Sequence, residues 1–315
     1  MPKTANRKKH ISLIPFVCGA GAKKGGTERG PAEVKKRGLH NDLRSAAWQS
    51  DPEALYLREQ EFYKNLPPLG SAERREAVLK HCREIAAGVE QAVKAGALPV
   101  TIGGDHSMAA GSIAGFAKAH DAFGRIGVIW IDAHGDIHTP ETSPSKAYHG
   151  MPLAALLGLG DQEFANIGGV SPVLRPEHIV YIGLRSTEAA ENRRISDLGI
   201  HTFDMKDISG ADMKKVFAKA LKAISKNIDY LVLSIDLDAF DPAEAPAVGS
   251  PEQGGLHVKD ILAALDHLTN LRVPDMVEVV EFNPDLAGAE QTYQLLKDVL
   301  ATILNVREPV IKPLS

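Results

Sequence analysis

The stretch Ile126-Gly-Val-Ile-Trp-Ile-Asp-Ala-His-Gly-Asp136 joins an uncharged run to a cluster of acidic and imidazole side chains. Its first six residues form a candidate strand. Asp132, His134 and Asp136 follow at once, spaced two residues apart, and in extended backbone that spacing places all three side chains on one face. The stretch therefore predicts a strand whose carboxyl end carries polar, potentially metal-ligating residues.

The same arrangement recurs at three other places in the chain. Gly103-Gly-Asp-His106, Asp236-Leu-Asp238 and Glu281 each come directly after a short apolar run. In an open parallel sheet the carboxyl ends of the strands form the crevice that binds ligands. We therefore expect the polar side chains after these strands to converge on one site: His106, Asp132, His134, Asp136, Asp236, Asp238 and Glu281.

Short β-rich runs alternate with longer helical periods along the chain, which predicts βαβ units and an α/β fold with a parallel sheet. The run 230–235 carries no charge, as is typical of a strand buried on both faces. No repeat or composition shift marks a linker, so residues 1–315 are predicted to form a single domain. The predicted strands are 11–16, 98–102, 126–131, 179–184, 230–235 and 276–280, and the predicted helices are 72–95, 107–120, 211–225, 258–268 and 290–304.

The convergence of acidic groups predicts bound cations. Several carboxylates packed closely would repel one another and shift their pKa values upward. Two divalent metal ions would remove that repulsion. Sites rich in carboxylate with some imidazole suit hard or borderline ions, so Mn²⁺ is the first expectation, with Ni²⁺, Co²⁺, Zn²⁺ and Fe²⁺ as rivals.

The composition excludes several other classes of function. The net charge of -4 gives no reason to expect nucleic acid or an anionic membrane as a partner. The two cysteines, Cys18 and Cys82, have no metal-ligand spacing and fit a reduced, cytoplasmic compartment. We interpret residues 1–9 as a basic disordered tail and Ile11 to Phe16 as a first buried strand rather than part of a secretion signal. The polar stretch 44–70 is expected to be a surface excursion.

The motifs together resemble the ureohydrolase family of arginases, agmatinases and their relatives. The matches are in order and span the chain, and residues 139–143 and 149–152 are most similar to bacterial arginases. The resemblance implies a three-layer α/β/α fold with a central, mostly parallel sheet, two Mn²⁺ ions, and a homotrimer or homohexamer. The matching segments are Gly25-Gly-Thr-Glu-Arg-Gly-Pro31, Gly103-Gly-Asp-His106, Asp132-Ala-His-Gly-Asp136, Ser234-Ile-Asp-Leu-Asp238 continuing to Asp241-Pro242, Gly254-Gly-Leu256 and Glu281-Phe-Asn-Pro284.

The resemblance also implies a role for each site residue. A hydroxide bridging the two ions would attack a guanidino carbon and release urea, most directly from L-arginine to give L-ornithine. Glu281 would pair with the guanidinium, Asp136 would carry a proton to the leaving nitrogen, and His149 would relay protons to solvent. One ion would be held by His106, Asp132, Asp136 and Asp236, and the other by His134, Asp132, Asp236 and Asp238.

The residues expected to contact the tail of the substrate depart from the family pattern. Lys146 and Ala147 stand where the family usually has Gly and Asn, Glu188 replaces an Asp, and Ser250 replaces a common Thr. Lys146 disfavours a cationic tail and tolerates an acidic one. We expect the substrate to be contacted by His138, Ser145, Lys146, Glu188, Ser250 and Glu281, with Glu191 matching a further acidic position of the family.

Several alternatives remain open at this point. Other ureohydrolase substrates are a guanidino acid such as 4-guanidinobutyrate, agmatine, or a formimino amino acid. A metal-dependent deacetylase on a similar fold is disfavoured by the intact Glu281-Phe-Asn-Pro284. A non-catalytic regulatory relative would be expected to have lost metal ligands, and every candidate metal ligand is present in this sequence.

Overall fold

The computed structural model describes residues 10–43 and 46–304, and its centre is one eight-stranded sheet. The strand order is β2-β1-β3-β8-β7-β4-β5-β6, and every pair of neighbours is parallel. The strands are β1 (Ile11–Pro15), β2 (Ala46–Trp48), β3 (Leu98–Ile102), β4 (Ile126–Ile131), β5 (Ile179–Ile182), β6 (His201–Phe203), β7 (Tyr230–Asp236) and β8 (Met276–Val280).

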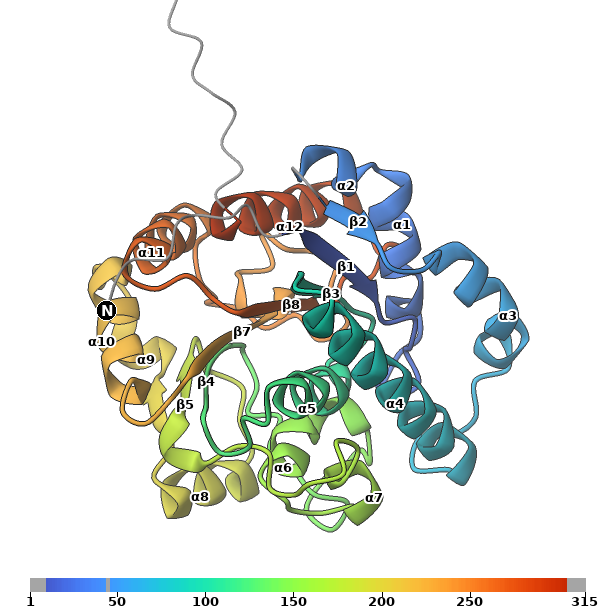
Figure 1. The fold of residues 1–315 in the computed structure, drawn as a ribbon, viewed down its shortest axis with the longest axis horizontal. Coiled ribbons are helices and arrows are strands. Elements are labelled where there is room, and N and C mark those ends of the chain that lie inside the picture. Colours follow the sequence, from blue (N-terminus) through green and yellow to red (C-terminus); the bar gives the residue numbers. More distant parts are fainter. Residues whose placement is uncertain (1–9, 44–45, 305–315) are drawn as a thin grey trace, which may run out of the picture.

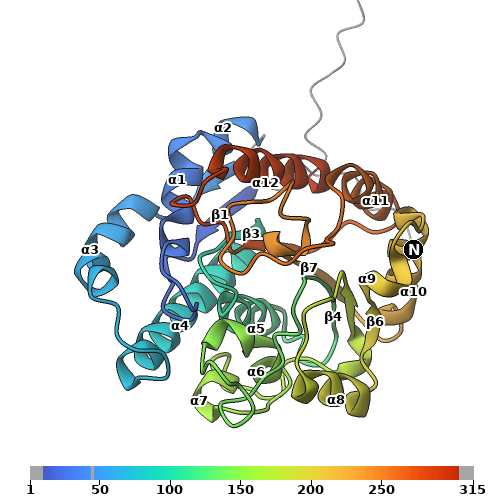
Figure 2. The ribbon, with the colours of Figure 1, turned by 180° about the vertical axis from the view of Figure 1, so that it is seen from behind.

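Helices cover both faces of this sheet, which gives three layers (Figure 1). Helices α10, α11 and α12 lie on one face, and α4, α5 and α6 lie on the other, as the view from behind also shows (Figure 2). The helices are α1 (Gly30–Lys36), α2 (Leu39–Asp42), α3 (Pro52–Lys64), α4 (Ala72–Lys94), α5 (Met108–His120), α6 (Pro152–Leu156), α7 (Gln162–Ala165), α8 (Ala189–Leu198), α9 (Met205–Ile208), α10 (Met213–Ile224), α11 (Val258–Leu271) and α12 (Ala289–Ile303), with short 3-10 turns at Thr27–Arg29, Tyr148–Gly150, Pro176–His178 and Leu237–Ala239.

The central strands are buried because both of their faces are covered. Every residue of β3, β4 and β8 is buried, and two separate apolar cores form, one on each side of the sheet. This pattern is typical of a parallel sheet between helical layers. It confirms the predicted α/β/α fold, and the sheet is wholly rather than mostly parallel.

Helices α4 and α5 pack unusually closely on one face of the sheet. A Cβ atom at Gly111 would lie 2.2 Å from the Cys82 carbonyl oxygen, and one at Gly115 would lie 2.2 Å from that of Ala86. Glycine is therefore required at both positions, because any side chain would separate the helices. This contact fixes α5 against α4.

Every predicted strand and helix forms, and the differences lie at the ends of elements and at the edges of the sheet. The strands predicted at 11–16 and 179–184 end earlier, at Pro15 and Ile182. The stretch 44–70, expected to be only a surface excursion, contributes the edge strand β2 and the largely exposed α3. The predicted tail, residues 1–9, lies outside the described residues. Within the described parts of the chain, each helix is too short or too polar to cross a lipid bilayer.

Candidate metal centre and active site

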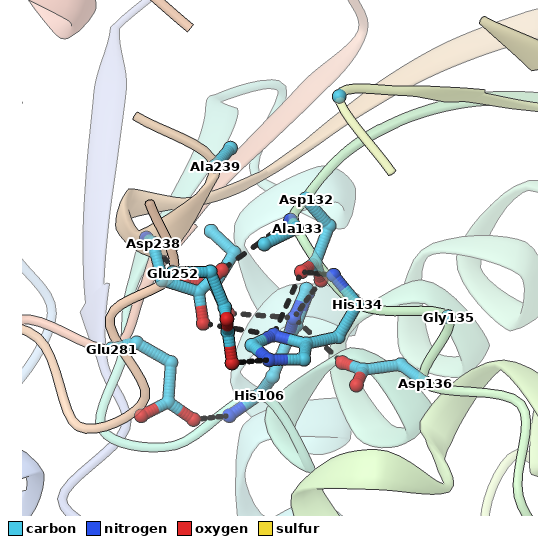
Figure 3. Close-up of polar contacts among 12 residues, drawn as sticks. His106, Asp132, Ala133, His134, Gly135, Asp136, Asp238, Ala239, Glu252 and Glu281 are labelled. Carbon is cyan, nitrogen blue, oxygen red and sulfur yellow. Dashed lines mark hydrogen bonds and ion pairs between the residues drawn. The ribbon is translucent and has the colours of Figure 1, made fainter. Parts of the chain in front are cut away.

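The strand order explains why the acidic motifs meet. Strands β3, β8, β7 and β4 are consecutive neighbours in the middle of the sheet, and each carries one motif at its carboxyl end. His106 follows β3, Glu281 follows β8, Asp236 ends β7 and Asp132 follows β4. Figure 3 shows residues from all four strand ends gathered around one point.

The first cluster surrounds the His106 ring. Its Nδ1 atom lies 3.1 Å from an Asp132 oxygen, 2.9 Å from Asp136 and 3.2 Å from Asp236. His106 is 1% exposed, and among residues 10–43 and 46–304 this buried nitrogen has no hydrogen-bond partner. A buried polar atom without a partner is costly unless something else satisfies it. The donor set of one imidazole and three carboxylates fits a divalent cation.

The second cluster shares Asp132 with the first. His134 Nδ1 lies 3.1 Å from Asp238 Oδ2 and 3.6 Å from Asp132 Oδ1. In each of the triads His106–Asp132–Asp236 and Asp132–His134–Asp238, the candidate ligand atoms lie within 4.8 Å of one another. Two ions sharing the Asp132 carboxylate therefore fit the residues present.

The electrostatics of the two clusters also favour bound cations. Burial raises the pKa of Asp236 well above its usual range, and the nearby Asp238 and Asp132 carboxylates raise it further. Burial and the adjacent Asp132 likewise raise the pKa of Asp136. Burial also opposes ionisation of Asp132, but the neighbouring His106 and His134 imidazoles outweigh this effect and lower the pKa of that carboxyl. The buried carboxyl groups of the two clusters can therefore all ionise only if bound cations balance their negative charge.

The carboxylates are oriented by fixed donors. Trp130 Nε1 donates to Asp132 Oδ2 at 2.9 Å, and the His134 backbone N–H donates to Asp132 Oδ1 at 2.7 Å. The Asp238 backbone N–H donates to Asp236 Oδ1 at 2.8 Å. The Trp130 ring also stacks on His106, with 4.4 Å between the ring centroids. Sequence reasoning did not single out Trp130, which lies within an apolar strand and resembles any other core residue there.

Glu281 lies beside the first cluster in a strained backbone conformation. Its φ of 68° is in the left-handed region, which is unusual for a non-glycine residue. Oε1 accepts from the His106 backbone N–H at 3.0 Å and lies 3.1 Å from His149 Nδ1. Oε2 is buried and has no hydrogen-bond partner among the residues that the structure describes. That second oxygen is therefore free to accept from a cationic ligand.

The loop after β4 carries several of the predicted tail-binding residues. Ser145 Oγ accepts from the Ala147 backbone N–H at 3.2 Å. Lys146 has a φ of 60°, and its ammonium donates to the Pro140 carbonyl oxygen at 2.5 Å. In this conformation the lysine is occupied by its own loop, so it would have to leave Pro140 to reach a substrate.

His138 faces the acidic start of α8. Its Nε2 atom lies 3.3 Å from Glu188 and 3.4 Å from Glu191. Glu191 is buried and already accepts from the Glu188 and Ile137 backbone N–H groups, so it holds the local structure together. Glu188 is half exposed, and besides contacting His138 it forms a capping box with Glu191 at the start of α8. Ser250 is partly buried and follows Gly249, which lies against the free Glu281 oxygen.

Two further residues at the strand ends were missed from the sequence. Arg185 donates to the backbone carbonyl oxygens of Gly183, Asp238, Ala239, Phe240, Glu252 and Gln253, so it ties the loops after β5 and β7 to each other. Glu252, on one of these loops, places Oε1 3.8 Å from His134 Nε2 (Figure 3). Neither has a local sequence signal, because both act through loops whose folded paths the sequence does not show.

Two His/Asp clusters sharing one carboxylate, at the carboxyl edge of a parallel sheet, define a binuclear metal-binding α/β protein. The family model named Arginase family matches residues 9–305. An arginase of Bacillus caldovelox is 37% identical over 293 residues, which cover 90% of this chain and 94% of that protein. An arginase of Bacillus subtilis is 34% identical, covering 94% of this chain and 98% of its own.

Solved arginase structures are similar to this fold as well. The native structure of the Bacillus caldovelox arginase superposes with a TM-score of 0.84 at 34% identity, covering 96% of this chain and 100% of that one. An Entamoeba histolytica arginase in complex with L-ornithine gives a TM-score of 0.81 at 30% identity, covering 93% of this chain and 97% of that chain. The chain therefore belongs to the arginase family. It is a metal-binding hydrolase of the ureohydrolase type, acting on a guanidino group.

Proposed function

We infer that the protein hydrolyses L-arginine to L-ornithine and urea with two bound Mn²⁺ ions. The observation that carries this inference is the pair of clusters sharing Asp132, next to a Glu281 carboxylate whose Oε2 atom has no hydrogen-bond partner in the described part of the chain. The two Bacillus relatives are arginases, and the similar Entamoeba arginase was solved in complex with L-ornithine. Both observations support L-arginine as the substrate.

The division of the ligands between the two ions follows the family resemblance, and the contacts of His106 and His134 support it for all but the second role of Asp236. His106, Asp132, Asp136 and Asp236 would hold one, and His134, Asp132, Asp236 and Asp238 would hold the other. Carboxylate oxygens dominate both sets, and this favours Mn²⁺ over the softer divalent metals.

The residues around the clusters perform the remaining chemistry. The bound ions supply a water activated as a nucleophile near neutral pH. The free Oε2 atom of Glu281 accepts hydrogen bonds from the guanidinium and holds its carbon in line for attack. The carboxylate of Asp136 accepts the proton of the attacking water and delivers it to the leaving amine, which departs poorly unless protonated.

We assign His149 the transfer of protons between the site and solvent. Its side chain is 14% exposed, while Nδ1 lies 3.1 Å from Glu281 Oε1. Burial lowers the pKa of His149, but the contact with Glu281 outweighs this effect and raises it. The imidazole thus contacts the buried carboxylate on one side and keeps some access to water.

Replacing His149 by Ala should therefore slow turnover and leave a defect that small bases repair. We expect kcat to fall roughly 10²-fold, which is a typical contribution of a positioned acid or base. Added imidazole should restore part of the rate, measured as urea release. An unchanged rate without imidazole would remove His149 from the proton path. A loss that imidazole does not repair would instead indicate that His149 only positions Glu281.

The residues expected to contact the substrate tail depart from the family pattern. Loss of the usual Asn at Ala147 removes one specific hydrogen bond, and sites with fewer such bonds discriminate less between analogues. Lys146 offers a carboxylate partner if its ammonium leaves the Pro140 carbonyl. A guanidino acid such as 4-guanidinobutyrate is thus the second candidate, and agmatine, which lacks a carboxylate, should be the poorest.

Urea release should be measured over arginine, 4-guanidinobutyrate and agmatine, with Mn²⁺, Ni²⁺ and Co²⁺ supplied separately. We expect about two metal equivalents per chain by elemental analysis, as binuclear hydrolysis requires. Arginine with Mn²⁺ should give the highest kcat/KM. A stoichiometry of one or none would contradict the mechanism. An agmatine kcat/KM above that of every guanidino acid would move the activity to the agmatinase type.

The family resemblance and the cysteines support a proposal for the assembly and the compartment. The resemblance to bacterial arginases favours a homotrimer or homohexamer, and the two buried free cysteines fit a reducing cytoplasm. Light scattering on the purified protein would distinguish these assemblies from a monomer.

A further inference from the structure

A buried carboxylate lies beneath the metal centre and takes no part in the chemistry described so far. Glu278 is in the middle of β8 and is 0% exposed. Its Oε1 accepts from Ser234 Oγ at 2.6 Å, and its Oε2 accepts from Ser112 Oγ at 2.5 Å. An acidic residue inside an otherwise apolar strand is costly to bury, so its presence calls for a reason.

Ser234 connects this carboxylate to the first cluster. In the pairing of β7 with β8, Ser234 is directly opposite Glu278, so the register of the sheet fixes their contact. On its other side, Ser234 Oγ lies 2.9 Å from His106 Nε2. The three groups form an unbroken buried chain from β8 to the ring of a candidate metal ligand.

The direction of the hydrogen bonds in this chain follows from counting protons. A serine hydroxyl has one proton, and a carboxylate can only accept. Ser234 therefore donates its proton to Glu278, so its oxygen must accept from His106 Nε2–H. In a neutral imidazole the other nitrogen, Nδ1, then carries a lone pair. That is the nitrogen without a hydrogen-bond partner, 2.9 to 3.2 Å from the oxygens of Asp132, Asp136 and Asp236.

We propose that Glu278 is a positioning residue which, through Ser234, fixes the tautomer and ring orientation of His106 so that Nδ1 is presented to the metal ion. The proposal rests on the binuclear site of the proposed function. A metal-binding histidine commonly donates a hydrogen bond from its other ring N–H to such a partner, and this interaction raises metal affinity. Here a serine is inserted between the histidine and the carboxylate.

The second candidate histidine ligand lacks an equivalent arrangement. Within the described part of the chain, the carboxylate that contacts His134 Nε2 is that of Glu252, at 3.8 Å, and the Glu252 side chain is 42% exposed. That contact is longer and open to solvent, so it fixes the ring less firmly. The ion at His106 should therefore be held in the more rigid of the two sites.

The matched pair Ser234→Ala and Ser112→Ala tests the proposal. Both variants remove one buried hydroxyl from Glu278, but only Ser234→Ala breaks the link to His106. Mn²⁺ affinity should be measured by equilibrium dialysis, with thermal melts of the metal-free proteins to establish that each variant folds. We expect Ser234→Ala to weaken binding of one Mn²⁺ ion about 10–100-fold, as loss of a histidine's supporting partner usually does. Ser112→Ala should change it several-fold less.

Glu278→Gln provides a second, nearly isosteric variant. The glutamine amide has one acceptor oxygen in place of two, so it cannot accept from both serines. We therefore expect Glu278→Gln also to weaken binding of the Mn²⁺ ion at His106. Equal affinities of Ser234→Ala and Ser112→Ala, or a wild-type affinity in Glu278→Gln, would overturn the proposal. If the wild-type protein itself bound fewer than two Mn²⁺ ions, the proposed function would fail first, and the two failures are thereby distinguishable.

Discussion

Asp136→Asn should fold and bind substrate yet lose nearly all turnover. The amide has the size of the carboxylate but cannot accept the proton of the attacking water, so we expect kcat to fall about 10³-fold or more. Because burial and Asp132 raise the pKa of Asp136, removing its charge should also ease repulsion in the metal-free protein. The melting temperature without metal should thus stay the same or rise. Urea release and thermal melts measure the two effects.

Two controls separate proton transfer from metal loss. The Mn²⁺ content of Asp136→Asn must be measured, since Asp136 is also a proposed ligand. Glu141→Gln removes a carboxylate from the same loop at a solvent-exposed position, and it should keep wild-type kinetics. Near wild-type kcat in a fully loaded Asp136→Asn protein would show that another group carries the proton.

Glu281→Gln should cause the second large loss, and here the loss should appear chiefly in kcat/KM. The free Oε2 atom would no longer offer a charged acceptor to a buried guanidinium. Removing one partner of a buried ion pair costs about 3–5 kcal/mol, roughly 10²–10³-fold or more in kcat/KM. Steady-state urea release over a range of arginine concentrations would measure it.

Asp285→Asn is the matched control for Glu281→Gln. Asp285 lies four residues further on, where it forms a half-exposed ion pair with Arg29. Such surface pairs contribute about 0–1 kcal/mol to stability, so turnover should be unaffected. If Glu281→Gln retained the kcat/KM of the wild type, Glu281 would not be the guanidinium partner.

The sequence predicted the central part of the fold because the pattern there is strong. The run 230–235 is uncharged and follows a clear helical period, and β7 indeed occupies the middle of the sheet. The acidic motifs could be grouped because each follows a strand directly, and parallel strands place their carboxyl ends at one edge. No structure was needed for either step.

The edge strands could not be predicted in the same way. Strands β2 and β6 have only three residues each and are partly exposed, so neither apolar runs nor alternation identifies them. Their formation depends on pairing with β1 and β5, which is tertiary information. Glu278 gave a signal that was overlooked, since a charge within an apolar strand is unusual. The contacts of Arg185 had no such signal, because they depend on the folded paths of separate loops.

The candidate ligands come from three strand ends far apart in the chain, with His106 and Asp238 separated by more than 130 positions. An unfolded chain could assemble such a set only by closing long loops, at a large cost in entropy. Ions would therefore bind the native state almost exclusively. By mass action, their binding free energy would be added to the stability of the fold, about 4 kcal/mol at a thousandfold excess over Kd. Metal supply would then govern the lifetime of the protein as well as its activity.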